Sequence, residues 1–84
     1  MLSEQDAMQA LKNAVESVLH EKFPNFNMET KLFDDLRMDS VSMLETLIEL
    51  EDSLNIDVNP EDLDIEDFLV VKSYVKFLMD TVNT

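Results

Sequence analysis

The sequence has no cysteine, no glycine and no tryptophan, and it contains only two prolines and one histidine. Without cysteine the chain can form neither a disulfide nor a thiolate metal site, and an intracellular location is expected. Without glycine a glycine-rich nucleotide-binding loop is excluded. Basic residues are also scarce, because 19 acidic side chains outnumber six basic ones and give a net charge of −13. A surface this negative repels nucleic acid, so no nucleic-acid partner is expected.

The length of 84 residues suits one small domain, and 45% of the residues are hydrophobic. That hydrophobic content, at helical spacing, favours a folded domain over disorder despite the high charge. No apolar run approaches the roughly 20 residues that a membrane span requires, and no basic stretch followed by an apolar one marks a signal peptide. The sequence therefore predicts a soluble, cytoplasmic monomer with a single domain over residues 1–84 and a core at about residues 4–82.

An apolar stripe at steps of three or four residues predicts a first helix over residues 4–21. Ser3 and Asp6 resemble a capping box at its start, and Pro24 stops it because proline disfavours helical geometry in the residue before it. A long connection then runs to about residue 38. We expect this connection to lie across the helices and close the core, because its apolar residues are too many for a solvated linker: Phe26, Met28, Leu32, Phe33 and Leu36.

The second predicted helix covers residues 40–54, with Asp39 as its N-cap. Acidic residues are concentrated around it, since residues 32–71 hold thirteen acidic side chains and only one basic one, Arg37. The apolar residues that recur at helical spacing along this helix are Val41, Leu44, Leu47, Ile48 and Leu54. The opposite face carries Glu45, Glu49 and Asp52.

Two further helices follow. Asn59-Pro60 is typical of a helix start, with a capping residue followed by proline at the first position, and predicts a short helix over residues 60–66. A last apolar stripe, with Tyr74 and Phe77 beside it, predicts a helix over residues 70–82. The predicted fold class is therefore all-α, a bundle of three main helices and one short helix with a long first loop.

The groups that catalysis requires are scarce, so we expect a protein that is not an enzyme. The only histidine, His20, lies near the end of the first helix, where the helix dipole favours a cation, and a structural or surface role is expected for it. The acidic segment Asp57–Asp62 suggests a calcium loop. An EF-hand requires glycine where the chain has Asp62 and glutamate where it has Phe68, so no metal site is predicted.

Ser40 stands apart because it follows the capping Asp39 in the first turn of the second helix. A phosphate attached to its hydroxyl would face unpaired backbone N–H groups and the positive end of the helix dipole. Without a histidine partner Ser40 is not expected to be a self-activated nucleophile, so modification by another enzyme is the expected chemistry. Simple capping at Asp39-Ser40 is the alternative interpretation.

The segment from Leu32 to Val41, with Leu44-Glu45 and Leu50-Glu51-Asp52 after it, closely resembles the acyl carrier protein family and its peptidyl and aryl carrier relatives. The helix lengths, the long first loop and the acidic second helix also fit, over about residues 4–80. The resemblance implies an acyl-carrier-like bundle in which a transferase attaches 4′-phosphopantetheine, taken from coenzyme A, to Ser40 next to Asp39. The thiol of that arm would carry an acyl or aminoacyl group as a thioester, and so bring thiol chemistry to a chain without cysteine.

Two residues depart from the family motif Gly-x-Asp-Ser-Leu, since Arg37 replaces the glycine and Val41 the leucine. Arg37 is expected either to contact the phosphate or an acidic partner, or to be a local counterion for Asp34, Asp35 or Asp39. The departures favour a stand-alone carrier for polyketide or nonribosomal peptide synthesis. The alternatives are a carrier for fatty-acid synthesis and an unmodified acidic adaptor that binds a basic partner.

The resemblance further implies that partner enzymes recognise the second helix. Its expected apolar contacts are Val41, Met43 and Ile48, although Met43 and Ile48 could instead fill the core, and its expected acidic contacts are Glu45, Glu49, Glu51 and Asp52. Glu66 and Phe68 are expected to add a second contact or to gate a cavity for the cargo. The implied partners are a phosphopantetheinyl transferase and acyltransferase, ligase or adenylating, and synthase enzymes with basic docking patches, and no membrane.

Overall fold

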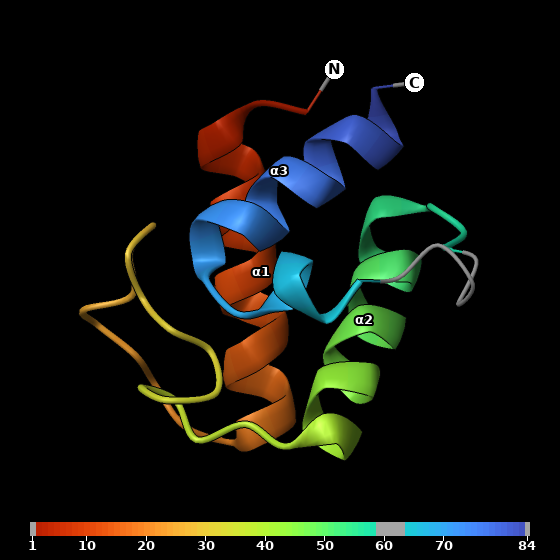
Figure 1. Cartoon of the computed structure of the whole chain (residues 1–84). Helices are drawn as coiled ribbons and strands as arrows, with labels where there is room; N and C mark the ends of the chain where they lie inside the picture. Colours follow the sequence, from red (N-terminus) through yellow and green to blue (C-terminus); the bar gives the residue numbers. More distant parts are fainter. Residues whose placement is uncertain (1, 59–63, 84) are drawn as a thin grey trace.

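The computed structural model describes residues 2–58 and 64–83. Its elements are the helices α1 (Glu4–Leu19) and α2 (Ser40–Leu54), the short 3-10 helix η2 (Ile65–Phe68) and the helix α3 (Val71–Val82). α1 contacts both α2 and α3, and η2 lies against α3 (Figure 1). Within the described residues the β-type pairing is one isolated bridge, between Lys31 and Val70. The prediction of an all-α bundle with three main helices and one short helix is confirmed.

The two predicted N-caps are confirmed. The Ser3 hydroxyl accepts a hydrogen bond from the Asp6 N–H at 3.1 Å, and the Asp39 carboxylate accepts one from the Ser42 N–H at 2.7 Å. Each bond satisfies one of the N–H groups that the start of a helix leaves without a partner inside the helix. α1 and α2 therefore begin where their sequences predict.

The ends of α1 and α2 share a conformation that the sequence patterns did not reveal. His20 and Asn55 follow the last helical residues in the left-handed region, with φ angles of 55° and 53°. A left-handed residue in this place is a common helix stop. α1 therefore ends at Leu19, before the predicted end at residue 21, and the stop is the backbone of His20 rather than Pro24.

A glutamate near each of these helix ends holds the segment that follows. Glu16 Oε2 accepts a hydrogen bond from the Phe23 N–H at 2.8 Å, and Glu51 Oε2 accepts one from the Val58 N–H at 2.9 Å. In both pairs the two residues are seven positions apart. The two glutamates thus fix the directions in which the chain leaves α1 and α2.

Most of the predicted short helix, over residues 60–66, falls outside the described residues. The predicted start at Asn59-Pro60 lies outside the described residues, as does most of the acidic segment Asp57–Asp62. The helix that the structure describes is η2, whose N-cap Asp64 accepts a hydrogen bond from the Glu66 N–H at 3.1 Å. α3 then begins at Val71, one residue after its predicted start, with Val70 as an N-cap that makes no side-chain bond.

The long connection between α1 and α2 packs over the helices, as predicted. Leu32 is fully buried, and its N–H donates to the Leu69 carbonyl at 2.9 Å. The Val71 N–H donates to the Thr30 carbonyl, also at 2.9 Å. Met38 is buried as well, and five more apolar residues of the connection are partly buried against the core: Phe23, Phe26, Met28, Phe33 and Leu36. The connection is therefore tied to the segment that precedes α3.

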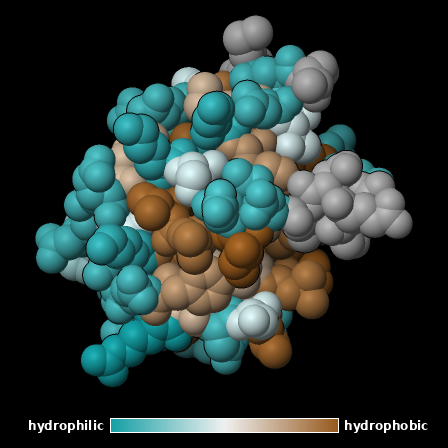
Figure 2. Space-filling view, viewed as in Figure 1, coloured by the Kyte–Doolittle hydropathy of each residue, from teal (hydrophilic) through white to brown (hydrophobic). Residues whose placement is uncertain are grey.

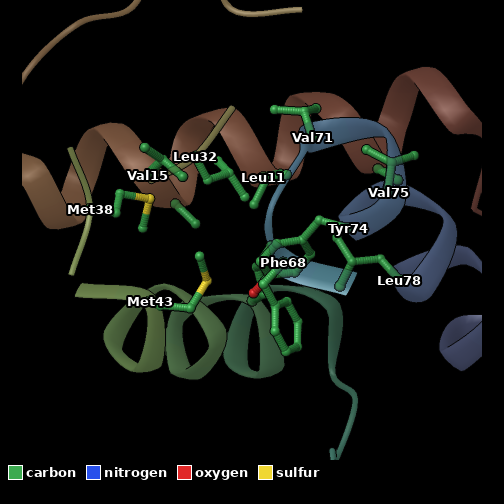
Figure 3. Packing of buried hydrophobic residues seen from close by; sticks show 13 residues of the cluster. Leu11, Val15, Leu32, Met38, Met43, Phe68, Val71, Tyr74, Val75 and Leu78 are labelled. Carbon is green, nitrogen blue, oxygen red and sulfur yellow. The ribbon is translucent and has the colours of Figure 1, made fainter. Parts of the chain in front are cut away.

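The core lies between the three helices and is closed by two aromatic residues (Figure 3). The ring of Phe68 in η2 packs edge-on against the ring of Tyr74 in α3, with centroids 4.8 Å apart and an interplanar angle of 64°. Such pairs add about 0.5–1.5 kcal/mol to the effect of burying the area. The largest side chains with no exposed surface are Leu11, Val15, Leu32, Leu50, Val71, Tyr74 and Leu78. Since these residues come from all three helices and the connection, the core joins the whole described chain.

The two ends of the described chain meet. The Leu2 N–H donates to Asn83 Oδ1 at 3.1 Å, and Asn83 Nδ2 donates to the Leu2 carbonyl at 3.2 Å. The start of α2 lies at the opposite end of the bundle (Figure 1). None of the helices among residues 2–58 and 64–83 combines the length and the hydropathy needed to cross a membrane.

Candidate functional site

Ser40 is the first residue of α2, and its side chain is exposed. The first turn of α2 contains no acidic residue. Apart from the capping carboxylate of Asp39, no acid of the helix offsets its positive end, and an anion attached to the Ser40 hydroxyl would lie where the helix dipole stabilises negative charge. The residues present at this helix start thus fit a covalently attached phosphate.

Asp39 fixes the backbone that leads into Ser40. The pKa of its carboxyl is lowered from its ordinary value, chiefly by the hydrogen bond from the Ser42 N–H and then by that from the Ser42 hydroxyl. Because these bonds favour the charged form, Asp39 stays ionised and capping at neutral pH. Its extended backbone, with φ −110° and ψ −179°, turns the chain into the helix at the serine.

Arg37 has a φ angle of 57°, in the left-handed region that favours glycine. This is the position where the resemblance implies a glycine, so the chain makes this left-handed turn with an arginine. The prediction of a local counterion is wrong: across residues 2–58 and 64–83 the ion pair joins Lys22 and Glu16, and Arg37 has no carboxylate partner. The exposed guanidinium is therefore available to another molecule close to the start of α2.

A cleft of about 220 Å³ begins at Ser40 and lies between α2, η2 and α3. Apart from Ser40 and one tyrosine, its lining is apolar: Phe33, Met43, Leu44, Leu47, Ile65 and Phe68. A group attached to Ser40 therefore has an apolar space beside its point of attachment.

Three of the predicted recognition residues are not free on the surface. The prediction that Met43 is exposed is wrong, because it is 8% exposed and lies with Leu47 and Leu50 on the buried side of α2. Phe68 is 5% exposed and forms a wall of the cleft, so it is not available as a surface contact. Glu51 is partly buried, and its carboxylate already accepts the Val58 N–H.

The remaining predicted residues do face solvent. Val41 is 64% exposed and Ile48 is 56% exposed, so the alternative that Ile48 fills the core is wrong. Leu44, which the apolar stripe placed with the core-facing residues, is also 56% exposed. Together with three exposed acids these residues form what we call the outer face of α2: Val41, Leu44, Glu45, Ile48, Glu49 and Asp52.

Apolar side chains also gather beyond α2. Figure 2 shows hydrophobic side chains over the middle and lower part of the face on which α2 and η2 lie in Figure 1. Ile65 of η2 is 61% exposed, and Glu66 beside it is exposed. The exposed apolar surface therefore extends from α2 to η2.

Sequence reasoning missed Tyr74 as a site residue. Its side chain has no exposed surface and lines the cleft, and its hydroxyl has no hydrogen-bond partner within the described part of the chain. Burial, and then the negative charge of Glu51, raise the pKa of Tyr74 far above its ordinary value, so the hydroxyl stays protonated. The available signal was a tyrosine within the apolar stripe of the last helix, which places a polar group in the core.

An exposed serine at a positive helix end, beside an apolar cleft, suits a protein that holds a group for other enzymes to use. The only histidine, His20, caps the end of α1 and is not among the residues that line the cleft. The structure therefore combines a small helical bundle with an exposed serine beside an apolar cleft.

The family model for the phosphopantetheine attachment site matches residues 9–78, most of the chain. The chain belongs to this family, that of the acyl and peptidyl carrier proteins, whose members carry covalently attached 4′-phosphopantetheine. No curated protein sequence matches the chain significantly. The chain is thus a phosphopantetheine-bearing carrier protein.

Proposed function

We propose that Ser40 carries the phosphopantetheine arm and that the protein delivers an acyl or aminoacyl thioester to partner enzymes. The observation that carries this proposal is the exposed position of Ser40 at the start of a helix whose first turn holds no acidic residue. The phosphate of the arm would lie at the positive helix end, with Asp39 holding the turn in shape. The arm supplies the thiol that the chain itself lacks.

The proposed docking surface for partner enzymes is the outer face of α2. Its carboxylates would steer basic docking patches toward the serine, and its apolar residues would supply short-range contact: Val41, Leu44 and Ile48. Electrostatic steering raises the rate of encounter more than it raises affinity, which suits a carrier that must be released after each transfer. The proposed partners are a phosphopantetheinyl transferase and acyltransferase, adenylating or synthase enzymes.

A polyketide or nonribosomal peptide pathway is the finer part of this proposal. It is supported by Arg37 and Val41, the two departures from the family motif. Both side chains are exposed, so they change what a partner meets rather than how the chain packs. We further propose that the protein has no catalytic activity of its own and acts as a monomer in the cytoplasm. A fatty-acid carrier is the alternative, and testing which synthase accepts the loaded protein distinguishes the two.

The test is to incubate the apo-protein with coenzyme A and a phosphopantetheinyl transferase of broad specificity, and to measure the intact mass. We expect the mass of one phosphopantetheinyl group to be added, no addition in Ser40→Ala, and full addition in the matched control Ser42→Ala. A mass gain that persists in Ser40→Ala would place the attachment elsewhere. No gain with any transferase, together with partner binding that survives Ser40→Ala, would favour the unmodified adaptor.

A further inference from the structure

Arg37 is the only arginine of the chain and the only basic residue among residues 32–71. Its side chain is exposed, and it forms no ion pair within the described part of the chain. The nearby carboxylates of Asp35 and Asp39 accept hydrogen bonds from backbone N–H groups instead, at 2.9 Å and 2.7 Å. The guanidinium therefore keeps its hydrogen-bond donors for a group that the polypeptide itself does not supply.

The backbone of Arg37 adopts a conformation that is unfavourable for an arginine. Its φ angle of 57° lies in the left-handed region, where a side chain crowds the following carbonyl oxygen. Of the other left-handed residues that the structure describes, His20 and Asn55 each stop a helix, whereas Arg37 follows none of the named helices. Glycine makes the same turn without crowding. A residue kept in such a conformation points to a use for its side chain.

Ser40 lies in the most negative part of the chain. Residues 32–71 hold thirteen acidic side chains, and the carboxylate of Asp39 caps α2 immediately before the serine. A phosphodiester attached to Ser40 would add one negative charge beside that carboxylate. The helix dipole offers the equivalent of only about half a positive charge. A cation close to the phosphate would therefore stabilise the loaded protein, and Arg37 is the one that this part of the chain provides.

Arg37 and Ser40 are near enough for such a contact. Three peptide units separate them, so their Cα atoms are at most about 11 Å apart. Met38, between them, points into the core (Figure 3), and its N–H donates to the Leu32 carbonyl at 3.3 Å. Since Arg37 and Ser40 are both exposed, both side chains extend into solvent from a segment that Met38 holds in place. An extended arginine and a phosphate on the serine can meet across this distance.

We propose that the Arg37 guanidinium binds the phosphodiester of the pantetheine arm attached to Ser40, with paired N–H groups donating to its two non-bridging oxygens. Arginine suits this contact because its planar donors match two phosphate oxygens, whereas lysine acts as a point charge. The inference rests on the proposed function, since it requires the arm at Ser40. The contact would fix the root of the arm beside α2 and leave its thiol end free to move.

The experiment compares the apo-protein and the loaded protein by NMR, with arginine labelled with ¹⁵N. Because Arg37 is the only arginine, the guanidinium signals report on this one residue. We expect loading to shift the Nε–H signal and to slow the exchange of its proton with water. Added salt should reverse both changes, because the Debye length falls to about 3 Å at 1 M salt.

Three variants separate this contact from a general effect of charge. In Arg37→Gln the ³¹P signal of the arm should move, and the gain in melting temperature on loading should fall by roughly 1–8 °C, as expected for one exposed ion pair. Arg37→Lys keeps the charge without the paired donors and should recover only part of that gain. The matched control is Lys76→Gln, which removes an exposed cation from α3 and should behave as the wild type does.

The outcomes distinguish this inference from the proposed function. If intact mass shows the arm at Ser40 but loading leaves the guanidinium signal unchanged, the contact with the phosphate is wrong while the carrier function stands. A signal that moves only when a partner enzyme is added would assign Arg37 to an acidic partner and also overturn the contact. Full recovery in Arg37→Lys would overturn the paired geometry. If nothing loads at Ser40, both proposals fail.

Discussion

Helices α1 and α2 have closely similar ends but different outer surfaces. Both begin at a side-chain cap, both end at a left-handed residue, and in both a glutamate holds the segment that follows. The exposed residues of α1 are all polar, whereas those of α2 include Val41, Leu44 and Ile48. Apolar side chains in water do not stabilise the fold, so this difference supports our proposal that partner enzymes dock on α2.

The first turns of the two helices also differ, in the number of acidic residues that they contain. α1 carries Glu4 and Asp6 in its first turn, where they interact favourably with its own dipole, and α2 carries no acid there. α1 thus adds acids within its first turn to a neutral cap, Ser3, whereas the negative charge at the start of α2 is confined to the capping Asp39. The comparison teaches that the two helices place negative charge differently, and that the first turn of α2 leaves room for the anion that we propose to be attached to Ser40.

The largest effect is expected when the outer face of α2 is made as polar as that of α1. In Val41→Gln combined with Ile48→Gln, loading by the transferase should fall about tenfold, because the few interface residues that dominate binding each cost over about 1 kcal/mol when their contact is lost, and we propose these two as the centre of the contact. The free energy of unfolding should change by under about 0.5 kcal/mol per substitution. Initial rates by intact mass and urea unfolding measure the two quantities.

The matched control for this change lies on α1, where Gln5→Ala combined with Gln9→Ala alters an exposed polar surface. These substitutions should leave the loading rate unchanged. Equal loading of the α2 double variant and the wild type would mean that the transferase does not use the outer face of α2.

A smaller effect is expected from giving α2 the acid that α1 has. Ser42 is the third residue of α2, as Asp6 is the third residue of α1. Ser42→Asp should slow phosphopantetheine loading roughly two- to fivefold, the equivalent of about 0.3–1 kcal/mol, because the new carboxylate repels the incoming phosphate. The deficit should shrink as salt is added, and the neutral variant Ser42→Asn should load at nearly the wild-type rate. Identical rates for the two variants would show that the helix end has no electrostatic part in loading.

The smallest effect is expected from lowering the pH, which should weaken the N-cap of α2 but not that of α1. Asp39 can be protonated in acid, whereas the hydroxyl of Ser3 does not titrate there. The pKa of Asp39 in the folded state lies below its ordinary value of 3.8. Its contribution to stability is therefore present above that ordinary value and is lost as the pH falls through the folded pKa. Amide hydrogen exchange should show the Ser42 N–H losing protection in strong acid before the Asp6 N–H does. In Asp39→Asn this difference should vanish, and a simultaneous response of both amides in the wild type would contradict the role of the carboxylate.

Much of the fold could be predicted because its signals are local. Ser3 and Asp39 are good caps by their chemistry, and the structure uses both. The end of α1 was less predictable, because the left-handed backbone of His20, rather than a residue type such as glycine, stops the helix. Most of the predicted short helix lies outside the described residues, and η2 was not predicted at residues 65–68 because it depends on the packing of Phe68 against Tyr74.

The site could be predicted only in part. Ser40 stands out from sequence because a helix start and a family motif coincide there. The rotation of α2 could not be read, because apolar residues lie on several sides of it and periodicity alone does not say which side faces the core. The sequence therefore could not show that Met43 is buried and that Leu44 is exposed. The stripe of the last helix could have suggested that Tyr74 is buried, but only the three-dimensional packing shows that its hydroxyl has no partner within the described residues.

The hydrogen bonds between Leu2 and Asn83 have a practical consequence for how this carrier can be handled. They bring both ends of the described chain to one end of the bundle, and Ser40 lies at the other (Figure 1). An affinity tag, a fluorophore or a surface tether attached at either end would point away from the serine and from the start of α2. The protein can therefore be immobilised by either end while a transferase or synthase still approaches the arm from the opposite side.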